Sequence, residues 1–428
     1  MVYQNRGLED WLKLDNAAKI YPAASPKRSP ALFRIYAIMQ EPVKLWIFKQ
    51  ALQRIMQRCP YYQVELKRGF FWFYLQRHSK IPEINLLEDI VLNKSIANPQ
   101  NADLLQVNIK SSTIALDFSH IITDGSGGFR FLISLLAEYL RLSGVDIRHT
   151  EILLDPDSRP DPEEYEDPHL KSFQKHSLSP QKMTPAFHLY GHPHRTEKPR
   201  LITGQLPIEK VLRLTRNKGI SITEYLVSLY IYCLVQIYHE TIRWKKSRRS
   251  VIRLEVPVNM RKFSFPRVMR NFSLFISPEI NLKLGRYSLP EIISIVHHSM
   301  QMQINDKELN RQISRNVGAE LNPLIRFLPL FCKNLYLSGL YSKLGENPYS
   351  GVLSNLGRIE LPPEMVEYIK LFNVIVYPNH VMKKSCSVIS YQQEMLITFA
   401  SIIESRELER LFFTQLVADG IPVFIREV

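Results

Sequence analysis

The sequence predicts a mixed α/β (α+β) fold divided into two parts. Strand candidates alternate with amphipathic helices in both halves of the chain. The 428 residues, 45% of them hydrophobic, exceed what one core usually organises, since domains commonly hold about 100–200 residues. A Pro-rich stretch separates the halves and is typical of a crossover. We therefore expect an N-terminal subdomain over residues 1–175, a linker over 176–200 and a C-terminal subdomain over 201–428.

The N-terminal half opens with a strand and a helix. Residues 33–39 (FRIYAIM) form the strand candidate. In residues 45–59 the apolar side chains recur every three or four positions, which places them on one face of a helix packed on a sheet. Residues 63–67 and 70–75 read as a hairpin, because Arg68-Gly69 separates them.

A second strand pair follows and leads to a glycine-rich loop. Residues 104–110 (LLQVNIK) and 112–119 (STIALDFS) are the two strands. The run His-Ile-Ile-Thr-Asp-Gly-Ser-Gly-Gly then occupies 120–128. Residues 129–142 (FRFLISLLAEYLRL) predict the next helix.

The C-terminal half repeats this mixture of elements. Its helix candidates are 221–238, with Ser221 or Thr223 as the N-cap, and 407–420, with Gly420 as the C-cap. Its strand candidates are 253–261, 371–377, 385–391 and 396–401.

One apolar stretch allows two interpretations. Residues 322–341 (NPLIRFLPLFCKNLYLSGLY) combine large apolar side chains with scattered basic ones. They could form a membrane-surface helix or a lid. A helix packed at the interface between the subdomains is the interpretation we favour.

The charge balance bears on the partners. The chain has 55 basic and 41 acidic residues, a net charge of +14, which favours a phosphorylated cofactor, an acidic carrier protein or an anionic membrane surface. The densest basic cluster lies within 243–249 and reads first as a solvated loop and second as a phosphate or carrier contact. There is no helix-turn-helix, zinc-finger or RNP signature, so we expect no nucleic-acid partner.

Cysteine and histidine usage favours a reducing compartment without a metal. The four cysteines are far apart in the sequence and sit among apolar neighbours, as buried small hydrophobes do. His188, His192 and His194 lack a carboxylate or cysteine that would complete a ligand set, so we expect no metal. The N-terminus is polar and no long uncharged apolar stretch occurs. We expect a cytoplasmic monomer, with peripheral membrane contact left open.

The strongest candidate for chemistry is the run His120-Ile-Ile-Thr-Asp124-Gly125. His120 follows the strand that ends at Ser119, at a position where loops carry function. Asp124 lies at a turn that the following glycines permit. A neutral histidine has a pKa suited to general-base work near pH 7. The alternative is a plain strand-to-helix turn with a capping aspartate.

This motif resembles the H-x-x-x-D-G of the condensation-domain and chloramphenicol-acetyltransferase-like superfamily. That group includes plant BAHD acyltransferases, wax ester synthases, peptide-synthetase condensation domains and bacterial alcohol acetyltransferases. KLDNAAKIYP (13–22) resembles the opening of the bacterial alcohol acetyltransferases. VPVNMRKFSFPRVMRNFS (256–273) and SNLGRIELP (354–362) resemble two further family segments, in the same order and with similar spacing.

The resemblance implies two chloramphenicol-acetyltransferase-like subdomains with an active-site channel between them. His120 matches the catalytic base, which takes a proton from the acceptor. Asp124, followed by Gly125, matches an aspartate that shapes the loop. Arg261 matches its partner arginine, so the resemblance implies that Asp124 and Arg261 touch.

Three further positions match family segments that face the substrate. Ser354 and Asn355 match the Ser-Asn-x-Gly element and are candidates for contacting the substrate or the oxyanion. Asn271 is a weaker candidate of the same kind. A plain strand-entry turn is an equally good interpretation of Ser354 and Asn355.

Two departures from the family patterns narrow the reaction. Ser119 stands where condensation domains usually carry a first histidine, which favours acyl transfer to an alcohol over amide formation. No DFGWG-like element appears, which disfavours a plant-type enzyme. We expect an O-acyltransferase that moves an acyl, in particular an acetyl, group from coenzyme A to a small alcohol.

Two other functions remain open at this stage. The donor could instead be a phosphopantetheinyl carrier protein, from which a polyketide or lipid acyl chain is released, and the acceptor could be an amine. A non-catalytic binding module with the same fold is the third possibility. No permanently bound cofactor is expected in any of them.

Overall fold

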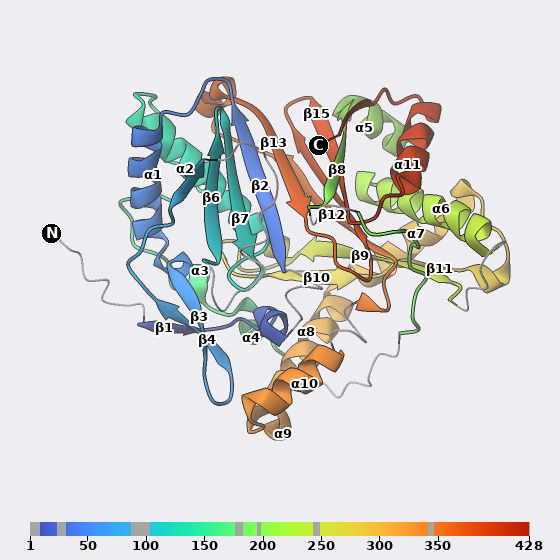
Figure 1. The fold of residues 1–428 in the computed structure, drawn as a ribbon, viewed down its shortest axis with the longest axis horizontal. Helices are drawn as coiled ribbons and strands as arrows, with labels where there is room; N and C mark the ends of the chain where they lie inside the picture. Colours follow the sequence, from blue (N-terminus) through green and yellow to red (C-terminus); the bar gives the residue numbers. More distant parts are fainter. Residues whose placement is uncertain are drawn as a thin grey trace.

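The computed structural model describes residues 9–23, 31–86, 103–175, 183–194, 198–242, 249–340 and 346–427. Two β-sheets lie side by side, and the helices cover their outer faces (Figure 1). The N-terminal sheet has the order β13-β2-β7-β6-β5, and the C-terminal sheet has the order β10-β9-β12-β14-β15-β8-β16 with β11 paired to β9. The predicted mixed α/β architecture is therefore confirmed.

The N-terminal half contains two sheets. The strands of the larger sheet that come from this half are β2 (Leu32–Met39), β5 (Ile84–Leu86), β6 (Leu105–Lys110) and β7 (Thr113–Ser119). A small sheet contains β1 (Trp11–Lys13), β3 (Val64–Arg68) and β4 (Phe73–Arg77). The three strands predicted at 33–39, 104–110 and 112–119 are present as β2, β6 and β7. The predicted hairpin is present too, since β3 and β4 pair antiparallel around Gly69.

Two long helices cover the N-terminal sheet. α1 (Leu45–Arg58) buries its apolar face, as its spacing predicts, and packs against α2 (Gly125–Leu142). α2 starts at Gly125 and not at Phe129, because the Asp124 side chain caps it by accepting from the Gly127 amide at 3.1 Å. The glycines of the motif thus belong to the first turn of the helix.

The C-terminal sheet is built mainly from long strands. They are β8 (Arg200–Pro207), β9 (Val251–Asn259), β10 (Ser273–Ile276), β11 (Glu279–Asn281), β12 (Gly351–Ile359), β14 (Lys384–Tyr391), β15 (Glu394–Ser401) and β16 (Phe424–Glu427). The predicted turn between β14 and β15 is present, since Tyr391 pairs with Glu394. β12 pairs parallel with β14 along most of its length but with β9 only at Gly351 and Val352, so Ser354 and Asn355 are paired on the β14 side and lie beyond the pairing with β9.

Four helices pack on the C-terminal sheet. They are α5 (Ile208–Asn217), α6 (Ile222–Ile242), α7 (Leu289–Gln303) and α11 (Glu407–Ala418). Ser221 is the predicted cap of α6, because its Oγ accepts from the Glu224 amide at 3.2 Å while its own amide donates to Glu224 Oε2 at 2.6 Å. Gly420 follows α11 with a φ of +84°, which suits its predicted C-cap role.

One strand crosses the expected division of the chain. β13 (Ile369–Val376) belongs by sequence to the C-terminal part, yet it pairs antiparallel with β2 at the edge of the N-terminal sheet. Phe372 and Val374 are buried in the N-terminal core. β13 thus pairs with β2 through backbone hydrogen bonds and adds side chains to the N-terminal core. The N-terminal sheet therefore contains a strand from beyond the expected boundary at residue 201.

Further helices lie below the two sheets in Figure 1. They are η1 (Ala18–Ala23), α3 (Pro162–Tyr165), α4 (Pro168–Lys171), α8 (Asp306–Leu321), α9 (Pro323–Arg326) and α10 (Leu330–Leu340). The interface packing favoured for residues 322–341 is only partly correct. α10 contacts η1, but Leu324 is 84% and Leu335 is 76% exposed.

Among the described residues no single helix is both long and apolar enough to span a membrane. α5 and α6 satisfy that length and composition only when taken together, across a bend of 87°. Cys59, Cys233 and Cys386 are buried as predicted, whereas Cys332 is half-buried. Except for Arg249, the basic cluster of 243–249 lies outside the described residues.

We predict that Gly204→Ala destabilises the fold. A Cβ at this position of β8 would overlap the ring of Phe413 from α11, which is itself buried. Overpacking of this kind lowers the free energy of unfolding by about 1–3 kcal/mol. Urea unfolding followed by circular dichroism measures it.

Gly318→Ala is the matched control. Gly318 lies in α8, and a Cβ there would meet nothing within 4 Å. Alanine in a helix interior should raise stability by about 0.5–1 kcal/mol. Equal effects of the two substitutions would contradict the packing of α11 on β8.

Candidate active site

His120 lies immediately after β7, where the chain turns toward α2. Its amide donates to the Ala31 carbonyl at 2.8 Å, which ties the start of the loop to the segment before β2. Its ring is half-buried between two aromatic rings: Tyr21 of η1 stacks on it with centroids 5.5 Å apart, and Phe33 of β2 lies at 4.7 Å. The imidazole thus contacts one aromatic ring from η1 and one from β2.

The surroundings of His120 favour its neutral form. Burial lowers the pKa of the imidazole below its ordinary value of 6.5, and this effect exceeds the opposing influence of the Asp124 carboxylate and of hydrogen bonds with Asn271 and Thr123. A neutral imidazole at pH 7 has a free nitrogen lone pair. It can therefore accept a proton without first losing one.

Asp124 fixes the loop that carries His120. One carboxylate oxygen caps α2, and the other accepts from Arg261 Nη1 at 2.9 Å and from the Phe272 amide at 2.8 Å. Burial tends to raise the pKa of this carboxyl, but Arg261 and the hydrogen bonds outweigh burial and lower it. Asp124 is therefore ionised, and its oxygens serve protein donors.

Arg261 joins the two halves of the chain, and the predicted contact with Asp124 is present. Besides Asp124, the guanidinium donates from Nε to the Val268 carbonyl at 2.8 Å and from Nη2 to the Arg270 carbonyl at 2.6 Å. The side chains of Arg261 and Asp124 are 9% and 8% exposed. This buried pair positions residues 268–272 against the start of α2.

Asn271 holds the backbone of His120 in place. Its side-chain amide donates to the His120 carbonyl at 2.8 Å and to Asp15 Oδ2 at 3.0 Å. Both amide hydrogens are therefore bonded within the protein. In this structure Asn271, the weaker candidate for contacting the substrate or the oxyanion, positions the backbone of His120.

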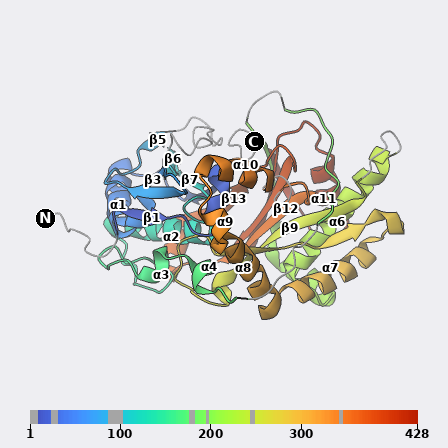
Figure 2. The same cartoon turned by 90° about the horizontal axis from the view of Figure 1, so that it is seen from below.

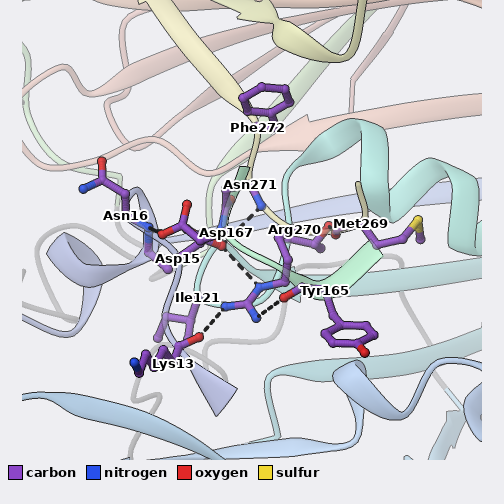
Figure 3. A network of polar contacts seen from close by, with 12 residues as sticks. Lys13, Asp15, Asn16, Ile121, Tyr165, Asp167, Met269, Arg270, Asn271 and Phe272 are labelled. Carbon is purple, nitrogen blue, oxygen red and sulfur yellow. Dashed lines mark hydrogen bonds and ion pairs between the residues drawn. The ribbon is translucent and has the colours of Figure 1, made fainter. Parts of the chain in front are cut away.

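Asp15 and Arg270 extend this network toward the N-terminus (Figure 3). The Asp15 carboxylate also accepts from the Ala18 amide at 2.7 Å and from Arg270 Nε at 3.3 Å. Arg270 reaches on to the carbonyls of Lys13 at 3.0 Å and Tyr165 at 3.3 Å. Both side chains are buried. The network thus connects η1, which carries Tyr21, with the loop of His120.

No feature of the sequence alone assigned roles to Asp15, Tyr21 or Arg270. Asp15 and Tyr21 lie in the segment 13–22 whose resemblance to a family was noted, and Arg270 lies in the segment 256–273. The resemblance of these two segments therefore pointed to the right regions of the chain but not to the individual residues. The partner of each side chain follows only from the folded chain.

The Ser354-Asn355 segment of β12 is held by different partners. Asn355 Nδ2 donates to Thr223 Oγ1 at 2.9 Å, and Asn355 Oδ1 accepts from the Gly357 amide at 2.9 Å. Gly357 has a φ of +79°, a conformation that glycine adopts at no steric cost. In the described part of the chain no hydrogen bond joins Ser354 or Asn355 to the network of His120.

Gly125 brings this segment close to the motif. A Cβ on Gly125 would lie 2.8 Å from Cδ2 of Leu356, so glycine allows the start of α2 to approach β12 closely. Gly125 therefore serves the packing of one half of the chain on the other. This contact places Ser354 and Asn355 beside the helix that Asp124 caps.

Two cavities flank this contact. One, of about 430 Å³, lies between α2 and β12 and is lined by residues that include Ser126, Arg130 and Leu356. The other, of about 400 Å³, lies on the α5 side of β12 and is lined by residues that include Asn355 and Ser390. Arg358 borders both. Neither cavity is lined by His120, whose ring faces Tyr21 and Phe33.

The histidines of the crossover form no metal site within the described residues, where no group of three or more His, Cys, Asp or Glu side chains is placed to hold an ion. His188 lies 2.8 Å from Arg249 Nη1. Burial, together with the nearby Arg249 charge, lowers the pKa of His188 to about 4.

Comparison with known proteins places the fold. No family model matches the chain, and no curated protein sequence does either. Several solved structures nevertheless match it over nearly its whole length, and three of them illustrate the likeness. TRI3 trichothecene 15-O-acetyltransferase from Fusarium sporotrichioides has a TM-score of 0.62 at 11% identity, over 96% of this chain and 94% of that chain.

The other two carry ligands. TRI101 of F. sporotrichioides, complexed with coenzyme A and T-2, has a TM-score of 0.63 at 9% identity, over 98% of this chain and 100% of that chain. A mutant starter condensation domain of rhizomide synthetase RzmA, in complex with C8-CoA and Leu-SNAC, has a TM-score of 0.57 at 11% identity, over 96% and 95%. The chain thus has the fold of the condensation-domain and chloramphenicol-acetyltransferase-like superfamily, as predicted.

We predict that Asp124→Asn destabilises the protein strongly. The substitution leaves the buried Arg261 guanidinium without its counter-ion, and breaking a buried pair costs about 3–5 kcal/mol. Arg261→Met should have an effect of similar size, because it leaves the Asp124 carboxylate uncompensated. Thermal and urea unfolding of both variants measure this.

Glu209→Gln is the control for these variants. It breaks the exposed Glu209–Arg213 pair of α5, whose side chains are 74% and 65% exposed, and should leave the unfolding midpoint unchanged. If Asp124→Asn were no more harmful than Glu209→Gln, Asp124–Arg261 would not be a structural constraint.

Proposed function

We propose that the protein is an O-acyltransferase that moves an acyl group from a coenzyme A thioester to a hydroxyl, with His120 as the general base. The observation that carries this proposal is the position of the His120 imidazole at the end of β7, on a loop held by the Asp124–Arg261 pair and by Asn271, in surroundings that favour its neutral form. Structures of the same fold bind coenzyme A or C8-CoA, which supports the donor class.

In the proposed reaction His120 accepts the proton of the acceptor hydroxyl. The oxygen bonds to the thioester carbonyl carbon, and the carbon–sulfur bond then breaks. The imidazolium returns its proton to the leaving thiolate, so the enzyme ends as it began. A positioned base contributes about 100- to 10,000-fold to such a step. Asp124 and Arg261 contribute by holding the loop, since their own polar atoms are bonded within the protein.

The expected donor is acetyl-CoA and the expected acceptor a small alcohol. The net charge of +14 favours a donor that carries phosphates. Ser354 is a candidate for contacting the substrate, since it lies on β12 beside the start of α2. Ser119, buried at the end of β7, stands where condensation domains usually carry a first histidine, which supports ester formation over amide formation.

A second candidate is transfer from a carrier protein. It is favoured by the condensation domain of the same fold that was solved with Leu-SNAC, and by the basic character of the chain. The two candidates share the chemistry at His120. They differ only in what delivers the thioester.

We predict that His120→Ala loses activity by about 100- to 10,000-fold with little change in stability, because the base is removed while the network around it remains. Coenzyme A release from acetyl-CoA is measured against a panel of alcohols and amines. His298→Ala is the control, since His298 is an exposed histidine of α7. Unchanged turnover by a folded His120→Ala variant would refute the enzyme proposal and leave a binding module.

We predict that the acid limb of kcat/KM lies below pH 6.5. The base must be neutral, and burial lowers the pKa of His120, so activity should persist below pH 6.5 and fall only as pH drops through the lowered value. A kcat/KM profile with one acyl donor tests this. A limb at or above pH 6.5 would show that another group sets the pH dependence.

The same panel separates the two donors. Turnover with acetyl-CoA and no carrier supports the first candidate. If only an acylated carrier protein supports turnover, and His120→Ala removes it, the second candidate holds.

A further inference from the structure

Large apolar side chains gather at one pole of the molecule, where the β3–β4 turn meets α9 and α10. We call this the apolar patch, defined by Phe70, Phe71, Leu324, Phe327, Phe331 and Leu335. Their exposed fractions are 72%, 41%, 84%, 71%, 60% and 76%. The two structures that form it protrude together at the bottom of Figure 1.

The patch is a built surface rather than two unrelated loops. The Leu330 amide donates to the Phe70 carbonyl at 2.9 Å, which joins α10 to the turn. Lys333 is buried beneath, where its Nζ donates to the carbonyls of Phe71 at 2.8 Å and Arg326 at 3.0 Å and lies 3.6 Å from the centroid of the Trp72 ring. The protein thus uses a buried lysine to hold apolar side chains outward.

The two segments that form the patch carry only basic charges, although Glu65, just outside the first segment, pairs with Lys67 at 3.0 Å. Residues 66–75 and 321–340 contain no Asp or Glu, but they contain Lys67, Arg68, Arg326 and Lys333. Lys67, Arg68 and Arg326 are exposed. Aromatic and leucine side chains rimmed by basic ones are the combination that inserts into the headgroup region of an anionic bilayer.

The patch is also connected to His120. α10 packs against η1, and η1 carries Tyr21, whose ring stacks on His120. Figure 2 views the molecule from this side and shows α8, α9 and α10 lying across the junction of the two halves. A molecule held in a membrane at this pole would present the His120 side of the junction toward the lipid.

We propose that the apolar patch docks the protein on an anionic phospholipid membrane. The exposed phenylalanine and leucine side chains enter the acyl boundary, while Arg68 and Arg326 contact headgroup phosphates. Docking does not depend on the proposed reaction, so the two can fail separately.

The test is co-sedimentation of the full chain with vesicles of phosphatidylcholine alone or with about one third phosphatidylglycerol, at low and high salt. We expect binding to the anionic vesicles that weakens with salt. Phe327→Glu/Phe331→Glu should lower the bound fraction at least tenfold. The control Leu284→Glu/Val417→Glu adds the same charge at two exposed apolar positions outside the patch, 79% and 55% exposed, and should bind as the parent does.

Arg68→Gln/Arg326→Gln separates charge from apolar contact and should abolish the preference for anionic vesicles. Equal loss of binding in the patch and control variants, or equal binding to neutral and anionic vesicles, overturns the proposal. So does a patch variant that converts a dimer to a monomer by light scattering while the parent does not bind vesicles, since the patch would then join two copies of the chain.

A measurement on the unmodified chain covers the case in which the patch variant does not fold. Brominated phosphatidylcholine mixed into anionic vesicles should quench the fluorescence of Trp72, which lies beside the patch, and the quenching should be absent in Trp72→Phe. No difference between the two proteins would also overturn the proposal.

Discussion

Arg261 lies where the two halves of the chain meet, and the geometry of the site depends on its pairing with Asp124. The Asp124 carboxylate accepts one hydrogen bond from the Gly127 amide in the first turn of α2 and another from the Phe272 amide. The guanidinium gathers the carbonyls of residues 268 and 270. A buried charge on either side would be costly without the other. His120 is therefore placed by electrostatics acting four residues away from it.

The same logic continues through Asn271. Its amide bonds the His120 carbonyl and the buried Asp15, and Asp15 in turn bonds Arg270. The side-chain nitrogens of Asn271 and Arg270 each donate to an acceptor within the protein. The imidazole ring is different, because it meets aromatic faces and carries a lowered pKa. The loop thus combines a network of polar contacts with an imidazole whose surroundings favour its neutral form.

Local pattern was enough to predict much of this fold. The spacing of apolar residues in 45–59 defined α1, and the Gly69 hairpin and the Ser221 cap followed from chemistry within a few residues. The contact of Asp124 with Arg261 came from a resemblance between segments. The hydrogen bond from Asn271 to Asp15 was not predictable, because 256 residues separate the two and only tertiary packing brings them together. The exposure of the apolar side chains of α9 and α10 was not predicted, for a related reason. Their apolar composition fits a buried helix equally well, and their exposure is seen only in the folded chain.

β13 has a consequence for how the protein is made. The sheet that carries His120 lacks its edge strand until residues 369–376 have been synthesised, because β2 has no other partner on that side. During translation the N-terminal half therefore waits, with an open sheet edge, for more than half of the chain to leave the ribosome. Such an edge is prone to pairing with other chains. Nascent copies on one messenger RNA are thus exposed to mispairing at β2, and a chaperone that shields this edge would matter more for this protein than for one whose first domain closes by itself.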